Sequence, residues 1–145
     1  MTDEQRLDIV AYRIETAQSF IPEIESHIQN GFYNTAMNRM YYACFSAASA
    51  LLVFIRVDGV KTHEGVRHLF CKNFIAEKIF DKKWSKFYSD MSECRSAADY
   101  EDFVYYTEED CNEMFPQAKE FILMIDEYIK SHPLPTSRMT GDFDD

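Results

Sequence analysis

The chain has 145 residues, 46% of them apolar, and a formal net charge of −10. This length suits one domain with its own hydrophobic core. The acidic balance excludes general coating of nucleic acid, so we expect no DNA partner, but it leaves room for a small basic pocket. Only four glycines and four prolines interrupt the chain, and this scarcity favours long helices over a strand-rich fold.

The first predicted helix opens at Thr2, which forms a capping-box pattern with Gln5. Its apolar residues recur with helical spacing as far as Ile28, and Gly31 can adopt the left-handed conformation that ends a helix. A second helix is predicted from about residue 33 to residue 55. Its uncharged stretch, residues 40–55, places it at the centre of a bundle.

Three shorter helical segments follow. Thr62 is expected to cap a third helix that runs roughly over His63–Ala76. A fourth helix is expected to begin near Asp81. Thr107 and Asp110 have the spacing that starts a fifth. We therefore predict an all-α, up-and-down bundle of four or five helices over residues 1–131, followed by a flexible acidic tail over residues 132–145.

The cysteines and the hydropathy predict a cytoplasmic protein. None of the four cysteines belongs to a CxxC pair, so we expect reduced core thiols rather than disulfides or a zinc site. They are Cys44, Cys71, Cys94 and Cys111. The longest uncharged run is too short to cross a bilayer, so no membrane association is expected. No Glu-x-x-His motif is present, so we expect no carboxylate-bridged metal centre and no cofactor.

Four stretches come in a recognisable order. They are NTAMNRMYYACFSAASALL at residues 34–52, KTHEGVRHLFCKNF at 61–74, RSAADY at 95–100 and AKEFILMIDEYI at 118–129. Together they resemble the HEPN superfamily of small helical domains. More narrowly, they are similar to its poorly characterised branch with YYA, TH-x-G and R-x-x-x-D-Y motifs. The resemblance covers nearly the whole chain except the tail.

The resemblance implies a helical homodimer. Many such relatives are encoded beside a minimal nucleotidyltransferase as toxin–antitoxin pairs, so a nucleotidyltransferase-like protein is the expected partner. Others are metal-independent ribonucleases in which an arginine and a histidine four to six residues later meet at the dimer cleft. There the histidine is the general base for the ribose 2′-hydroxyl, and the arginine holds the phosphate.

This chain departs from the ribonuclease pattern. No histidine follows Arg95 within seven residues, so the usual catalytic pair does not carry over and enzymatic activity stays open. Arg56 and His63 have a similar separation, but they straddle a predicted turn, so we treat that spacing as coincidence.

The best candidate site is the group of Arg95, Asp99 and Tyr100. On a helix, Arg95 and Asp99 share one face. The structural interpretation is that Asp99 and tyrosine hydroxyls hold Arg95 to order the bundle. The functional interpretation is that Arg95 binds phosphate, Asp99 orients it and Tyr100 stacks on a base.

A second set of candidates lies on the two preceding helices. His63 can pack or cap locally, or it can face the fourth helix and join Arg95 as an acid–base group. Asn38, Tyr41 and Tyr42 interrupt an apolar helix. Their side chains either belong to the core, with hydroxyls bonded to Arg95 or Asp99, or contact a ligand directly.

Three functions remain open from the sequence. The first is a nucleotide- or RNA-phosphate-binding module that acts in a toxin–antitoxin pair through Arg95. The second is a metal-independent ribonuclease in which His63 or Tyr100 replaces the usual histidine. The third is a structural, antitoxin-type protein whose acidic surface neutralises a basic partner.

Overall fold

The computed structural model describes the backbone of residues 1–100 and 104–138 and the side chains of residues 1–95 and 104–138. Within this part of the chain only helices form, as the sequence predicted. They are α1 (Asp3–Gln29), α2 (Tyr33–Phe54), α3 (His63–Phe70), the π-helical turn η1 (Cys71–Ile75), α4 (Lys83–Tyr100) and α5 (Glu108–Ser131). None of these described helices is long and apolar enough to span a membrane.

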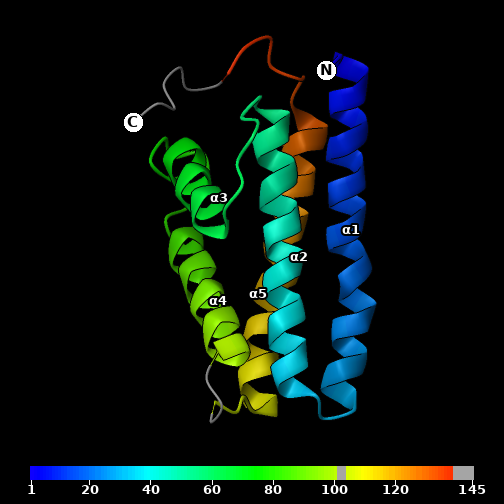
Figure 1. Cartoon of the computed structure of the whole chain (residues 1–145), viewed down its shortest axis with the longest axis vertical. Helices are drawn as coiled ribbons and strands as arrows, with labels where there is room; N and C mark the ends of the chain where they lie inside the picture. The colour runs from blue at the N-terminus through cyan, green and yellow to red at the C-terminus, as the bar shows by residue number, and fades with distance from the viewer. Residues whose placement is uncertain (101–103, 139–145) are drawn as a thin grey trace.

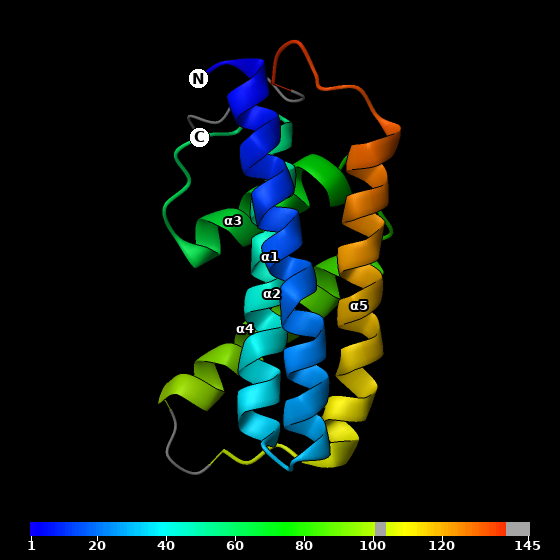
Figure 2. The ribbon, with the colours of Figure 1, turned by 90° about the vertical axis from the view of Figure 1, so that its right-hand side faces the viewer.

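The helix α2 lies at the centre of the bundle. It runs beside α1 and α5 along the long axis of the molecule, while α3 and α4 cover another side of it (Figure 1). Figure 2 shows that α3 and α4 cross this axis obliquely. The turn between α1 and α2 contains Gly31 with a φ of +80°, which a glycine adopts without strain. The helix α2 therefore contacts α1, α3, α4 and α5 and carries the largest share of the core.

The residues of α2 explain its central position. Alanines at positions 36, 43, 47 and 50 are fully buried, so neighbouring helices approach its backbone closely. Larger side chains then fill the space between α3, α4 and α5. Phe70 and Tyr88 stack with ring centroids 5.8 Å apart, and Phe121 meets both edge-on. This ring cluster fixes how α3 and α4 sit against α2.

The predicted caps are confirmed, but the third helix differs from its prediction. Thr2 and Thr107 each form a complete capping box. The predicted helix over residues 63–76 changes to a π-helical turn after Phe70. In that turn the buried side chain of Asn73 donates a hydrogen bond to the carbonyl of Leu69 (2.8 Å). Hydrophobic spacing does not distinguish such a turn from continued α-helix.

The segment after α5 returns to the start of the bundle. Leu134 packs against the core, and the carbonyl of Pro135 accepts a hydrogen bond from Nε of Arg56 (2.5 Å). Arg56 also donates to Asp3 of α1 (2.9 Å). Residues 132–138 of the predicted tail thus include contacts with the core and with Arg56, just after α2, and residues 139–145 lie outside the described part.

Candidate functional site

The start of α3 fixes the position of His63. Thr62 is the N-cap residue, and its hydroxyl accepts a hydrogen bond from the backbone N–H of Gly65 (2.9 Å). His63 is therefore the first residue of the helix. It lies between Thr62 and Gly65, the two residues that the capping hydrogen bond joins. The predicted cap is confirmed.

Gly65 makes this cap possible. A Cβ atom at this position would lie 2.8 Å from the hydroxyl oxygen of Thr62 and 3.1 Å from a methyl carbon of Val60. The first distance is shorter than the closest normal approach of a nonbonded carbon and oxygen. A larger residue would therefore displace the cap or the loop before it. The glycine of the TH-x-G motif thus has a packing role next to His63.

Aromatic side chains of α2 surround the imidazole of His63. Its ring stacks on Phe45 with a centroid distance of 4.4 Å and an interplanar angle of 27°. Tyr42 meets it edge-on at 5.9 Å. The hydroxyl of Tyr41 and Nδ1 of His63 are hydrogen-bonded at 2.7 Å, and the histidine tautomer decides which atom donates. These contacts fix both the position and the plane of the imidazole.

Arg95 contacts the same tyrosine from α4. Its Cζ atom lies 5.9 Å from the centroid of the Tyr41 ring, which is within the range of a cation–π contact. Burial raises the pKa of Tyr41, and the positive charge of Arg95 acts in the opposite direction. The Tyr41 side chain is 1% exposed, whereas His63 and Arg95 are both half-buried. A buried tyrosine thus links two partly accessible basic side chains from different helices.

The other predicted site residues are only partly placed. Tyr42 and Asn38 are half-buried on α2, within one turn of Tyr41. Asp99 and Tyr100 belong to the last turn of α4, but their side chains lie outside the described residues, so the predicted contact between Arg95 and Asp99 stays a prediction. The structure does bring His63 and Arg95 to one tyrosine, and the role of His63 as an acid–base group stays a prediction.

Sequence reasoning missed one member of the cluster. Tyr88 of α4 is fully buried, and its ring meets Tyr41 edge-on at a centroid distance of 6.3 Å. Burial raises the pKa of Tyr88 well above its usual range, so the phenol stays neutral. It lies on the same helix as Arg95, two turns earlier. Helical spacing alone gives it no distinction from the neighbouring core aromatics.

The cysteines and acidic residues add no second centre to this region. The thiols of Cys44 and Cys111 are free and buried, as predicted, whereas Cys71 and Cys94 are free but only half-buried. Burial raises the pKa of Cys44, so this thiol stays protonated. Among the described residues, no group of three His, Cys, Asp or Glu side chains is placed to hold a metal ion.

The arrangement supports two kinds of chemistry. The planar guanidinium of Arg95 can donate paired hydrogen bonds to a phosphate, which Lys cannot do with the same geometry. An imidazole held by a stack and by a hydrogen bond to one nitrogen is oriented for proton transfer or hydrogen bonding at the other. Both groups are accessible, because neither is fully buried.

Comparison with known proteins agrees with the helical architecture. The model of the HEPN domain matches residues 10–128. A UPF0332 protein of Thermotoga maritima is 30% identical over 122 residues, which cover 84% of this chain and 92% of that protein. Two proteins of Methanocaldococcus jannaschii, named "Putative toxin MJ0142" and "Putative toxin MJ0605", are 26% and 28% identical, and each match covers 81% of this chain and 80% or more of the relative. The chain therefore belongs to the HEPN domain family.

Proposed function

We propose that this chain is the toxin-type member of a toxin–antitoxin pair and that it binds an RNA phosphate through Arg95 and His63. The observation that carries the proposal is the shared contact with Tyr41, whose hydroxyl bonds to His63 and whose ring lies under Arg95. The names of two relatives from M. jannaschii support the toxin role. Growth arrest of a host that expresses the wild type, and not Arg95→Ala, tests that role.

The two basic side chains have different tasks in this proposal. Arg95 supplies a fixed charge and a forked donor for the phosphate oxygens. His63 supplies a second donor whose direction is set by Phe45 and Tyr41. Tyr42 is half-buried beside His63 and offers an aromatic surface for the neighbouring base. The site is thus suited to single-stranded RNA, whose bases are available for stacking.

RNA binding tests this proposal directly. We expect Arg95→Ala to weaken the affinity for a fluorescein-labelled single-stranded RNA, measured by anisotropy, by at least about tenfold, because charge-assisted hydrogen bonds are lost. The control is Arg67→Ala, whose guanidinium pairs with the exposed carboxylate of Glu64. Equal affinity of Arg95→Ala and Arg67→Ala would contradict the proposal.

The salt dependence gives an independent check. The net charge is −10, so we expect the rest of the surface to repel phosphate and the phosphate contacts to be confined to the site. If one phosphate is bound, the logarithm of the affinity should fall against the logarithm of the salt concentration with a slope of about −0.7. A slope several times steeper would show many phosphate contacts and would contradict a single site.

A metal-independent ribonuclease is the second candidate function. The hydrogen bond between Tyr41 and His63 favours it, because an oriented imidazole can act as the general base that the chain lacks after Arg95. RNA should then be cleaved in excess chelator by the wild type and by His68→Ala, an exposed position on the same helix, but not by His63→Ala. Intact RNA in all three reactions removes this candidate and leaves the binding function.

The assembly is also proposed rather than observed. We infer a homodimer and a nucleotidyltransferase-like partner, because the HEPN resemblance implies both. Light scattering coupled to size-exclusion chromatography measures the first, and a mass of one chain would contradict it. Coexpression with the protein encoded beside this chain measures the second: failure of the two to copurify would contradict the partnership while leaving RNA binding untouched.

A further inference from the structure

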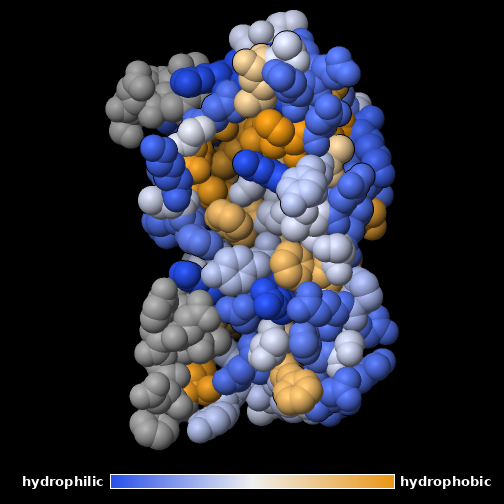
Figure 3. Space-filling view, turned by 45° about the vertical axis from the view of Figure 1, so that its right-hand side comes forward, coloured by the Kyte–Doolittle hydropathy of each residue, from blue (hydrophilic) through white to orange (hydrophobic). Residues whose placement is uncertain are grey.

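A cavity of about 230 Å³ lies between α1, α2 and the segment that connects α2 to α3. On the face shown in Figure 3 it appears as a hollow floored by hydrophobic side chains in the upper half of the molecule. Its volume equals that of roughly eight liquid waters, so it has room for a small organic molecule. Seven of its twelve lining residues have apolar side chains, namely Met1, Ile9, Leu52, Val53, Val57, Val60 and Val66.

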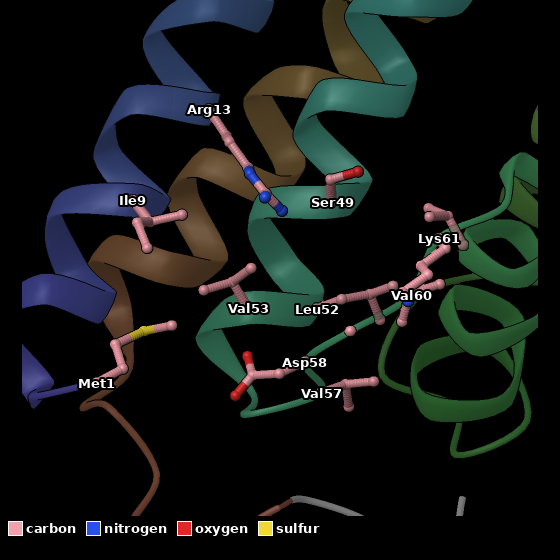
Figure 4. A pocket seen from close by; sticks show the side chains of 12 residues that line it. Met1, Ile9, Arg13, Ser49, Leu52, Val53, Val57, Asp58, Val60 and Lys61 are labelled. Carbon is pink, nitrogen blue, oxygen red and sulfur yellow. The ribbon is translucent and has the colours of Figure 1, made fainter.

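Three side chains that can donate hydrogen bonds to an anion reach this cavity from different elements. Arg13 extends from α1 toward Ser49 of α2, and Lys61 lies on the opposite side, before α3 (Figure 4). Neither Arg13 nor Lys61 forms an ion pair with another residue in the described part of the chain. Ser49 is only 9% exposed, and its hydroxyl forms no hydrogen bond within that part. Two cations and a hydroxyl therefore line the cavity together with its apolar side chains.

The carboxylate at the cavity does not cancel these charges. Asp58 receives two hydrogen bonds from the guanidinium of Arg6, at 2.7 and 2.8 Å. Arg6 is 6% exposed and lies against the end of α2, where it also donates to the carbonyl of Val53 (2.9 Å). The charge of Asp58 is thus balanced within the fold, and the net charge that the cavity presents is positive.

We propose that this cavity binds a small organic anion with a carboxylate or phosphate monoester head and a short apolar body. Arg13 and Ser49 bind the head, because a guanidinium and a hydroxyl together offer several donors to its oxygens. Lys61 adds a second positive charge at the mouth. The aliphatic wall covers the body, as in most small-molecule sites, where a few polar groups fix the orientation. This binding site is separate from Tyr41, Arg95 and His63.

The acidity of the whole protein makes such binding specific. A net charge of −10 repels anions from the rest of the surface. Binding of an anion therefore requires a local positive site, and a cation of the same shape provides the matched comparison. Hexanoate and butyl phosphate carry the proposed heads, and hexylammonium carries a similar body with the opposite charge.

The experiment is a titration of the full chain with each of these three compounds, followed by amide shifts in two-dimensional NMR spectra. We expect hexanoate, butyl phosphate or both to shift the amide resonances of residues around the cavity in a saturable manner. The compound that binds more tightly identifies the head group. Hexylammonium should leave these amide resonances unchanged. Saturation by hexylammonium at the same concentrations, or no saturable shift with either anion, would overturn the proposal.

Two variants locate the bound anion. Arg13→Gln should lower the affinity for the tighter-binding anion by at least about tenfold. Lys61→Gln should lower it by only about threefold, because Lys61 is exposed and its charge is screened. The controls are Arg39→Gln and Lys119→Gln, which remove the same charges far from the cavity lining. Unchanged binding by a folded Arg13→Gln would overturn the assignment. RNA affinity is measured separately and is expected to be the same in all four variants.

Discussion

Two arginines illustrate how this fold treats a charge at its interior. Arg6 of α1 is 6% exposed and gives hydrogen bonds to Asp58 and to the carbonyl of Val53. Arg95 of α4 is half-buried and lies over the ring of Tyr41, which is itself bonded to His63. The first is held by a carboxylate and a carbonyl, whereas the second lies in a cluster of aromatic side chains.

These different surroundings are the reason why we propose a structural role for Arg6 and a ligand-binding role for Arg95. Arg6 joins the start of α1 to the end of α2, and its donors are directed at groups of the protein. Arg95 contacts the ring of Tyr41, whose hydroxyl is bonded to His63, and in our proposal one ligand binds to both basic side chains. Removal of the charge at Arg6 should therefore lower mainly the stability of the protein. Removal of the charge at Arg95 should lower mainly the affinity for RNA.

The largest effect is expected for Arg6→Ala. The substitution removes three hydrogen bonds and leaves Asp58 and the Val53 carbonyl without their partner, so we expect a loss of about 2–3 kcal/mol in the free energy of unfolding. The value stays below that of a fully buried pair because the Asp58 side chain is 47% exposed. Urea unfolding at pH 7 measures it. A loss below about 0.5 kcal/mol would show that the pair does not hold the fold.

Arg95→Ala should show the reverse pattern. We expect the loss in unfolding free energy to stay below about 1 kcal/mol, since the described contact is a partly exposed cation–π contact. RNA affinity should nevertheless fall by at least about tenfold. Urea unfolding and anisotropy on the same preparation separate the two quantities. A variant as unstable as Arg6→Ala would mean that Arg95 is a structural residue as well, and the contrast would fail.

A smaller effect is expected at Gly65. In an ordinary helix Gly→Ala stabilises by up to about 1 kcal/mol, but here the added Cβ would displace the Thr62 cap. We therefore expect Gly65→Ala to destabilise the protein by about 1 kcal/mol. We also expect it to lower the affinity for RNA about threefold, because His63 moves with the cap. Thr62→Ser keeps the capping hydroxyl and is the control. Stabilisation by Gly65→Ala would show that the close approach has no role.

The smallest effect concerns pH. Hydrogen bonds from Arg6 hold the pKa of Asp58 below its usual range. The folded pKa is therefore lower than the unfolded value of about 4, so this carboxylate contributes stability above pH 4 that is lost as the pH falls through the folded pKa. Asp58→Asn should lose less stability than the wild type between about pH 5 and pH 3. Parallel pH profiles in urea unfolding would contradict the assignment.

The sequence predicted the helices better than it predicted their contacts. The capping pairs at Thr2 and Thr107 are local signals, and both are present as expected. The pairing of Arg6 with Asp58 joins residues 52 positions apart, and it depends on the path of the segment after α2. No spacing rule reveals such a pair. The π-helical turn at residues 71–75 was missed for a related reason, because its hydrophobic pattern is also that of an α-helix.

For the candidate site, the sequence identified most members but not their geometry. The motifs singled out Tyr41, His63 and Arg95, and all three meet in the structure. The hydrogen bond between the hydroxyl of Tyr41 and Nδ1 of His63 could not be predicted, because it depends on how α3 packs across α2. The expected contact of Arg95 with Asp99 stays a prediction, because the Asp99 side chain lies outside the described residues. The contact of Arg95 with the ring of Tyr41 joins two helices, so residue spacing within α4 does not reveal it.

We propose that Arg95 and His63 act together on one RNA phosphate. A double-mutant cycle of RNA affinity with Arg95→Ala, His63→Ala and the double variant tests it most directly. If Tyr41 links the two groups in one site, the losses should not add, and the coupling should be about 1 kcal/mol. Strictly additive losses, or no loss in either single variant, would contradict a common site.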